Sequence, residues 1–180
     1  MDILTLNWFV ALGALGMLSA GFAIGVADTL GYRAHHPFVR RYSLTAAAAI
    51  AVVATALSLV YSEHFGVLPC GLCWFARICL FSMAIILPVA WWRNDVRIAP
   101  YALALSGVGA LISLYHHYIQ MGGTSALPCP ASGAGDCAKR FIFEFGFVTF
   151  PLIGFACFAL LIVMFVSLYR SGALDSEQKA

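Results

Sequence analysis

Five long apolar segments restrict the folds open to this chain more than any other feature of its sequence. The segments cover about residues 8–28, 43–61, 74–92, 99–119 and 147–169. None has a charged residue near its centre, and roughly 20 apolar residues in a helix span the hydrocarbon core of a bilayer. Only 10% of the residues are charged, against about a quarter in soluble globular domains. The sequence therefore predicts an all-α, polytopic membrane helical bundle and excludes a soluble globular domain.

The first apolar segment has one alternative interpretation, a cleaved secretory signal. The run Leu18-Ser19-Ala20 would make a tolerable cleavage site. A signal peptide begins with positive charge, however, whereas Met1 to Trp8 contains Asp2 and neither lysine nor arginine. The sequence therefore favours a retained transmembrane helix.

Arginine and lysine residues orient the predicted bundle, because short loops rich in them stay in the cytoplasm. Seven such residues fall on one side of the membrane: Arg33, Arg40, Arg41, Arg93, Arg97, Arg170 and Lys179. The opposite side has Lys139 and Arg140 as its only loop cations. We therefore expect a multi-pass protein of the cytoplasmic (inner) membrane whose loops around 62–73 and 120–146 face the periplasm or its equivalent.

Two cysteine pairs lie in those outward-facing loops. Cys70-Gly-Leu-Cys73 directly precedes the third apolar segment, and Cys129 and Cys137 lie in the long loop 120–146. The N-terminus of a helix stabilises negative charge and so favours the thiolate. Outside the cytoplasm, disulfides persist instead of being reduced. The pattern predicts a redox enzyme that moves electrons between thiols.

Other interpretations of the four loop cysteines fit less well. A structural zinc site draws on close-spaced pairs, whereas the second pair here is Cys-x7-Cys with no histidine pair after it, so we expect no metal. A c-type haem needs histidine directly after Cys-x-x-Cys, and Trp74 stands there. Two static disulfides are a further alternative, although the four-residue ring that a Cys70–Cys73 disulfide would close stabilises a fold little.

Arg77 strengthens the redox interpretation. It follows Cys73 by four residues and therefore shares its helix face. A charge buried near the centre of a membrane costs on the order of 3 kcal/mol, less where the side chain reaches the interface. We expect the guanidinium to stabilise the Cys73 thiolate and negative charge on an electron acceptor. Simple snorkelling to the interface is the alternative.

The run Tyr115-His116-His117-Tyr118 lies at the outer end of the fourth segment. Adjacent side chains on a helix point about 100° apart, so one histidine is expected to face the bundle interior. That histidine could hydrogen-bond or protonate a reducible carbonyl, or merely anchor the helix at the interface. Glu63 and His64 read as interfacial residues.

The cysteine motifs carry a resemblance to a known family. The run Cys70-Gly-Leu-Cys-Trp-Phe-Ala-Arg-Ile78, the histidine–tyrosine stretch ending in Gln120, the second cysteine pair and Phe145-Gly-Phe-Val-Thr-Phe-Pro151 resemble the DsbB/BdbC membrane thiol oxidases over about residues 43–170. The resemblance implies a four-helix bundle that binds a quinone, either ubiquinone or menaquinone. It also implies a DsbA-like partner, an exported thioredoxin-fold oxidase that the bundle reoxidises.

The resemblance assigns a role to each loop cysteine. Cys129 would be attacked by the thiol of the partner, and Cys137 would be the leaving group that passes the electrons on. Cys70 would receive them by exchange between the loops, and Cys73 would contact the quinone ring.

The resemblance also implies a quinone site. Arg77 would polarise a quinone carbonyl. The family's histidine beside the quinone matches His116 if the motif is aligned on Gln120, and His117 if it is aligned on the preceding tyrosine. His116 is preferred.

The chain departs from the family at its N-terminus. Residues 1–40 add an apolar helix and a cytoplasmic loop before the expected thiol oxidase domain at 41–170, and 171–180 form a cytoplasmic tail. The bilayer and the DsbA-like oxidase are the expected partners, and no nucleic acid is expected.

Three rival functions differ in testable ways. A vitamin K epoxide reductase-like protein would carry the two cysteine pairs in the reverse order. A haem carrier could use His64 with His116 or His117. A non-enzymatic membrane protein would hold static disulfides.

Overall fold

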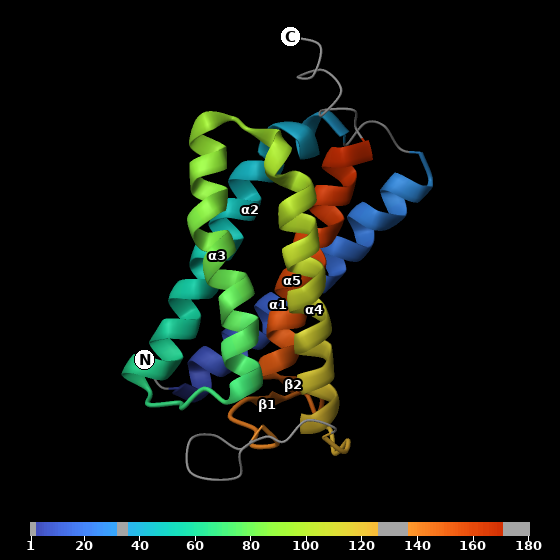
Figure 1. The fold of residues 1–180 in the computed structure, drawn as a ribbon. Coiled ribbons are helices and arrows are strands. Elements are labelled where there is room, and N and C mark those ends of the chain that lie inside the picture. The colour runs from blue at the N-terminus through green and yellow to red at the C-terminus, as the bar shows by residue number, and fades with distance from the viewer. Residues whose placement is uncertain (1–2, 32–35, 126–136, 171–180) are drawn as a thin grey trace.

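The computed structural model describes residues 3–31, 36–125 and 137–170 (Figure 1). Its helices are α1 (Ile3–Thr29), α2 (His36–Leu59), α3 (Gly71–Arg93), α4 (Ala99–Gln120) and α5 (Phe150–Arg170). Five helical spans are long and apolar enough to cross a membrane. The predicted fold class is thereby confirmed: a polytopic bundle with a four-helix core and one extra N-terminal helix.

Helices α2 to α5 form the core of the bundle. Small residues on α2 and α4 let the backbones approach closely, and Ala47, Ala51 and Ala102 have no exposed surface. Larger apolar side chains fill the space between them, among them Met83 and Phe158. The outer faces carry exposed apolar residues, as expected of helices that face lipid.

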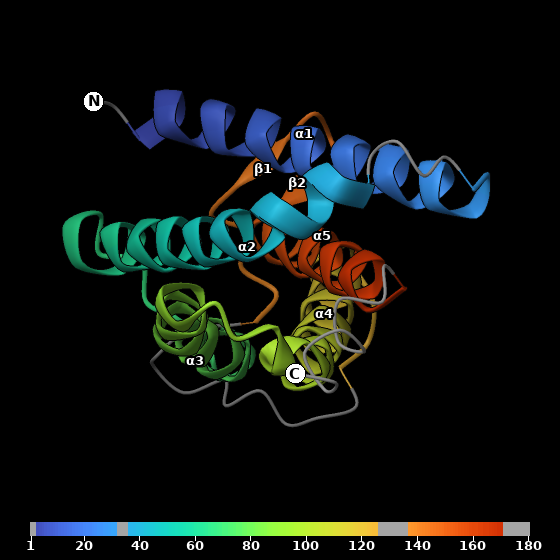
Figure 2. The ribbon, with the colours of Figure 1, turned by 90° about the horizontal axis from the view of Figure 1, so that it is seen from above.

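Helix α1 lies along the face formed by α2 and α5, on the side away from α3 and α4 (Figure 2). It packs mainly on α5, where Gly21 approaches Leu160 closely enough that an added Cβ would lie 3.7 Å from its Cδ1. At the C-terminal end of the helix, Ser167 on α5 donates a hydrogen bond to Asp28. The extra helix is therefore docked onto the core along much of its length.

The end of the bundle that carries Cys70, Cys73 and Cys137 is called the cysteine end. Its further elements are the π-helical turn η2 (Val60–His64) and an antiparallel hairpin of β1 (Phe143–Glu144) and β2 (Val148–Thr149). The α3–α4 connection, with the 3₁₀ turn η3 (Val96–Ile98), lies at the opposite end (Figure 1).

The hairpin is a detail that the sequence analysis does not predict. Phe145 and Gly146 adopt positive φ angles of 54° and 78°, and the Phe147 N–H donates to the Glu144 carbonyl over 3.2 Å. Two successive residues with positive φ make the tight turn that suits the twist of a hairpin. The hairpin leads directly into α5. Thr149 in its second strand and Ile142 just before its first strand are fully buried.

Candidate redox site

Cys70 is the N-cap of α3. Its backbone is extended, with φ −75° and ψ 174°, and its sulfur accepts the Cys73 N–H over 3.4 Å. This bond satisfies one of the free N–H groups at the start of the helix. The two residues are free cysteines, and their sulfurs share a hydrogen bond across 3.2 Å. The helix start therefore holds the dithiol in one defined geometry.

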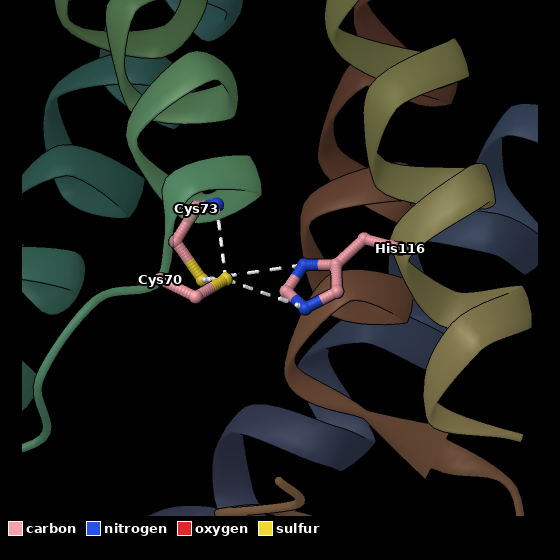
Figure 3. A group of neighbouring side chains, drawn as sticks. All are labelled: Cys70, Cys73 and His116. Atoms are coloured by element: carbon pink, nitrogen blue, oxygen red, sulfur yellow. Dashed lines mark hydrogen bonds between the residues drawn. The ribbon is translucent and has the colours of Figure 1, made fainter. Parts of the chain in front are cut away.

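His116 on α4 faces this dithiol (Figure 3). Its Nε2 lies 3.6 Å from the Cys70 sulfur, and its Nδ1 lies 4.0 Å from the Cys73 sulfur. The same Nε2 lies 3.1 Å from the carbonyl oxygen of Cys137. A carbonyl oxygen only accepts hydrogen bonds, so Nε2 carries a proton and, in the neutral ring, Nδ1 is the acceptor. His116 therefore turns its basic nitrogen toward Cys73.

The Cys70 thiol is strongly acidified. The hydrogen bond with Cys73, helped by the hydrogen bond with His116, lowers the pKa of Cys70 to about 4, although burial acts in the opposite direction. The sequence predicts the thiolate at Cys73, whereas the hydrogen bonds in the structure favour the charge on Cys70. The two arrangements differ only by the position of one proton along the 3.2 Å contact between the sulfurs.

Cys137 brings the second cysteine pair to the same place. It is disulfide-bonded, 1% exposed, and packed in one cluster with Cys70, Leu72 and Ile119. Cys129 lies outside the described residues. The structure thus juxtaposes one member of the loop pair with the dithiol at the start of α3.

Arg77 is held inside the bundle by α2. Its Nε donates to the Ser58 hydroxyl over 2.9 Å, and one terminal nitrogen donates to the Ser58 carbonyl over 2.8 Å. The guanidinium carbon also lies 5.5 Å from the ring centroid of Trp74. With 8% of its surface exposed, Arg77 keeps its charge within the protein instead of reaching for the interface. Ser58 has no linear signal in the sequence, because its role depends on how α2 and α3 pack.

His117 points elsewhere. Its Nδ1 lies 2.7 Å from the Thr149 hydroxyl on β2, so it links α4 to the hairpin. Of the two adjacent histidines, the structure therefore brings His116 to the dithiol and His117 to the base of α5. The functional roles of both stay predictions.

A cavity of about 510 Å³ adjoins the dithiol. Its volume falls in the range of small-molecule sites. Polar groups gather where it meets the cysteine end, namely Cys70, Cys73, Arg77, His116 and Gln120. The rest of its wall is largely apolar and comes from all five helices.

Gln120, which lines the cavity, has one buried polar atom without a partner among the described residues. Its Nε2 donates to the Lys139 carbonyl over 2.9 Å. Its buried Oε1 has no hydrogen-bond partner among the described residues. Buried polar atoms are almost always satisfied, so this oxygen is an exception within the described part of the site.

The dithiol also meets one geometric requirement of a metal site. Donor atoms of Cys70, Cys73 and His116 lie within 4.8 Å of one another, and zinc accepts such ligands. The expectation of no metal stays a prediction.

Comparison with known proteins decides the family. The model of the family described as disulfide bond formation protein DsbB matches residues 40–168. The chain belongs to the DsbB family. This match begins after α1, so the family region is the four-helix core.

Curated relatives agree with DsbB membership. The chain is 39% identical over 124 residues to a probable disulfide formation protein C of Bacillus cereus, covering 67% of this chain and 89% of the relative. It is 35% identical over 116 residues to disulfide bond formation protein C of Bacillus subtilis, covering 63% of this chain and 83% of the relative. No solved structure gives a significant match. The chain is a membrane protein of disulfide bond formation, and a disulfide oxidoreductase role follows from its family.

Proposed function

We propose that the chain reoxidises an exported, DsbA-like thioredoxin-fold oxidase and passes the electrons to a membrane quinone. The observation that carries this proposal is the Cys70–Cys73 dithiol at the polar end of a largely apolar cavity, in contact with the segment of Cys137. A site that only held static disulfides would not need an adjoining cavity lined by Arg77 and His116.

The thiol relay begins at the loop pair. A thiolate of the partner attacks Cys129, the Cys129–Cys137 bond breaks, and Cys137 leaves as the thiolate. The second thiol of the partner then attacks the mixed disulfide with Cys129. The partner leaves with its own disulfide formed, and Cys129 and Cys137 remain as thiols. Packing of Cys137 with Cys70 supports the next exchange, in which the loop pair reduces a Cys70–Cys73 disulfide and is reoxidised itself.

The described geometry suits the step that follows. Cys70 and Cys73 lie reduced, and Cys137 is disulfide-bonded. A quinone bound in the cavity would accept two electrons and two protons. The Cys70 thiolate and the Cys73 thiol would supply the two electrons as the Cys70–Cys73 bond forms. Nδ1 of His116 is placed to take the Cys73 proton and return it to the reduced ring, whose second proton would come from water.

Side chains around the cavity fit such an acceptor. Arg77 offers N–H donors to a carbonyl oxygen of the oxidised ring. Apolar walls suit a prenyl tail.

The proposed orientation places the cysteine end outside the cytoplasm. Arg93 and Arg97 flank the α3–α4 connection at the opposite end of the bundle, where the positive-inside rule expects the cytoplasm. A partner acting on exported proteins would then meet the loop pair directly.

Turnover of the purified protein tests the proposal. Reduced thioredoxin-fold oxidase is supplied with ubiquinone or menaquinone, and quinone absorbance is followed. We expect turnover in wild type and in Cys79→Ser, whose thiol is buried in the helical core, and none in Cys70→Ser. Absence of turnover in wild type with both quinones would leave static disulfides as the better explanation.

A further inference from the structure

Helix α1 is what this chain adds to the family region, since Ile3–Thr29 lies wholly before the matched residues 40–168. Five of its residues line the cavity: Leu6, Phe9, Val10, Gly13 and Met17. Their spacing of three and four places them on one face of the helix. The last lies eleven positions after the first, which is about 16 Å along the axis. The added helix therefore forms a long wall of the cavity.

The cavity changes character along this wall. The cysteine end carries the reactive and charged groups, whereas Leu80 and Phe158 line its deeper part. These residues lie nine and eight positions into α3 and α5, about 12 Å from the start of each helix. Met17, which lies 14 positions into α1, also lines the cavity. An amphipathic ligand with a polar ring and an apolar chain matches this gradient.

Contacts fix α1 at the start of the cavity-lining stretch and beyond its end. Near the cysteine end, the Tyr61 hydroxyl donates to Asn7 Oδ1 over 2.7 Å, and both side chains are buried. Towards the other end, Gly21 packs on Leu160 and Asp28 bonds to Ser167.

Between these contacts, Gly13 faces open space. A Cβ added there would meet no atom within 4 Å. The helix is therefore anchored at both ends and spans a hollow at its middle.

We infer that α1 is part of the acceptor site and binds the apolar tail of the quinone against Phe9, Gly13 and Met17. This inference rests on the proposed function. The polar ring lies at the dithiol, and the tail runs along α1 into the bilayer. Helix α1 then discriminates between quinones by the length of the tail and not by the chemistry of the ring.

Two glycines of α1 give a matched pair of variants. Gly13→Leu places a side chain in the cavity without a backbone clash. Gly16→Leu makes the same change three residues on, where an added Cβ also meets nothing within 4 Å but the residue does not line the cavity. Both replace glycine in a helix by a better helix former, so any difference between them reports on the cavity.

The kinetic test compares two quinones with the same ring and either a long prenyl tail or a very short one. For Gly13→Leu we expect KM for the long-tailed quinone to rise about tenfold, the scale of discrimination in an apolar pocket. KM for the short-tailed quinone and kcat should stay near wild type, and Gly16→Leu should match wild type throughout. Equal KM values in wild type and Gly13→Leu, or equal shifts in both variants, would overturn the inference.

A binding test does not depend on turnover. A quinone with a photoreactive diazirine on its tail is crosslinked to the full-length protein in lipid nanodiscs, and labelled residues are mapped by mass spectrometry. We expect label between Phe9 and Met17, competed by unlabelled long-tailed quinone and reduced in Gly13→Leu. Label confined to other helices in an active wild-type protein would refute the role of α1 while the proposed function stands. Label on α1 in a protein without turnover would refute the proposed function alone.

Discussion

His116 Nε2 lies 3.1 Å from the carbonyl oxygen of Cys137, and this contact joins the two cysteine pairs of the protein. The same ring reaches both sulfurs of the dithiol. One histidine therefore contacts both the Cys137 segment and the two sulfurs of the dithiol.

Replacement of His116 should slow oxidation of the dithiol. We expect His116→Phe to lower the rate of quinone reduction about 10²-fold, the lower end of the range for loss of a general base. His117→Phe loses the contact with Thr149 instead, and we expect its rate loss to be at least about tenfold smaller. Stopped-flow quinone absorbance measures both. Equal losses in the two variants would contradict the assignment of His116 as the base.

Reactivity of Cys70 should persist at low pH. Because the pKa of Cys70 is lowered to about 4, the thiolate dominates above that pH and is lost as the pH falls through it. Alkylation of the reduced protein by iodoacetamide, mapped to Cys70 by mass spectrometry, should therefore have its midpoint near pH 4. His116→Phe removes a lowering contribution and should move the midpoint upward. A wild-type midpoint near pH 8 to 9, where free thiols titrate, would contradict this geometry.

Arg77 should matter for the acceptor and not for the partner. We expect Arg77→Met to lower quinone reduction about 10²-fold or more, since one preorganised donor at a developing charge contributes on that scale. Reduction of the loop disulfide by the partner should continue at the wild-type rate. Alkylation trapping of each cysteine pair separates the two steps. A variant that blocked the partner step equally would show that Arg77 acts through folding.

The buried contact of Asn7 with Tyr61 should stabilise the docking of α1. Tyr61→Phe leaves the side-chain Oδ1 of Asn7 without its donor. We expect a loss of about 1–3 kcal/mol in the free energy of unfolding. Asn7→Leu should cost a similar amount, and the double variant should cost less than the sum. Unfolding in mixed micelles measures the cycle. Strict additivity would show that the two side chains do not interact.

Hydropathy predicts the five helices because spanning a bilayer requires a length and a composition that are local properties of the chain. Helix periodicity also places Cys73 and Arg77 on one face, and both line the cavity. The choice between His116 and His117 depends on how α4 is rotated within the bundle, which no local pattern fixes. The sequence therefore predicts that one of the two histidines points inward, and the packing of α4 shows that His116 is the one beside the dithiol.

Other parts of the site depend on contacts between distant residues. Asn7 and Tyr61 are 54 positions apart, and Ser58 meets Arg77 only after α2 packs on α3. The hairpin at 143–149 has only two residues in each strand, and its aromatic residues match the pattern of an interfacial segment equally well. The cavity wall formed by α1 has no signal in the sequence at all.

A single-turnover experiment tests the central claim most directly, namely that the Cys70–Cys73 dithiol itself gives its electrons to a quinone. Protein with Cys70 and Cys73 reduced and the loop pair replaced by Cys129→Ser and Cys137→Ser is mixed with one equivalent of quinone in the absence of any partner. The account predicts one quinol per protein, formed together with a Cys70–Cys73 disulfide seen by mass spectrometry. Unreacted quinone beside a reduced dithiol would contradict it.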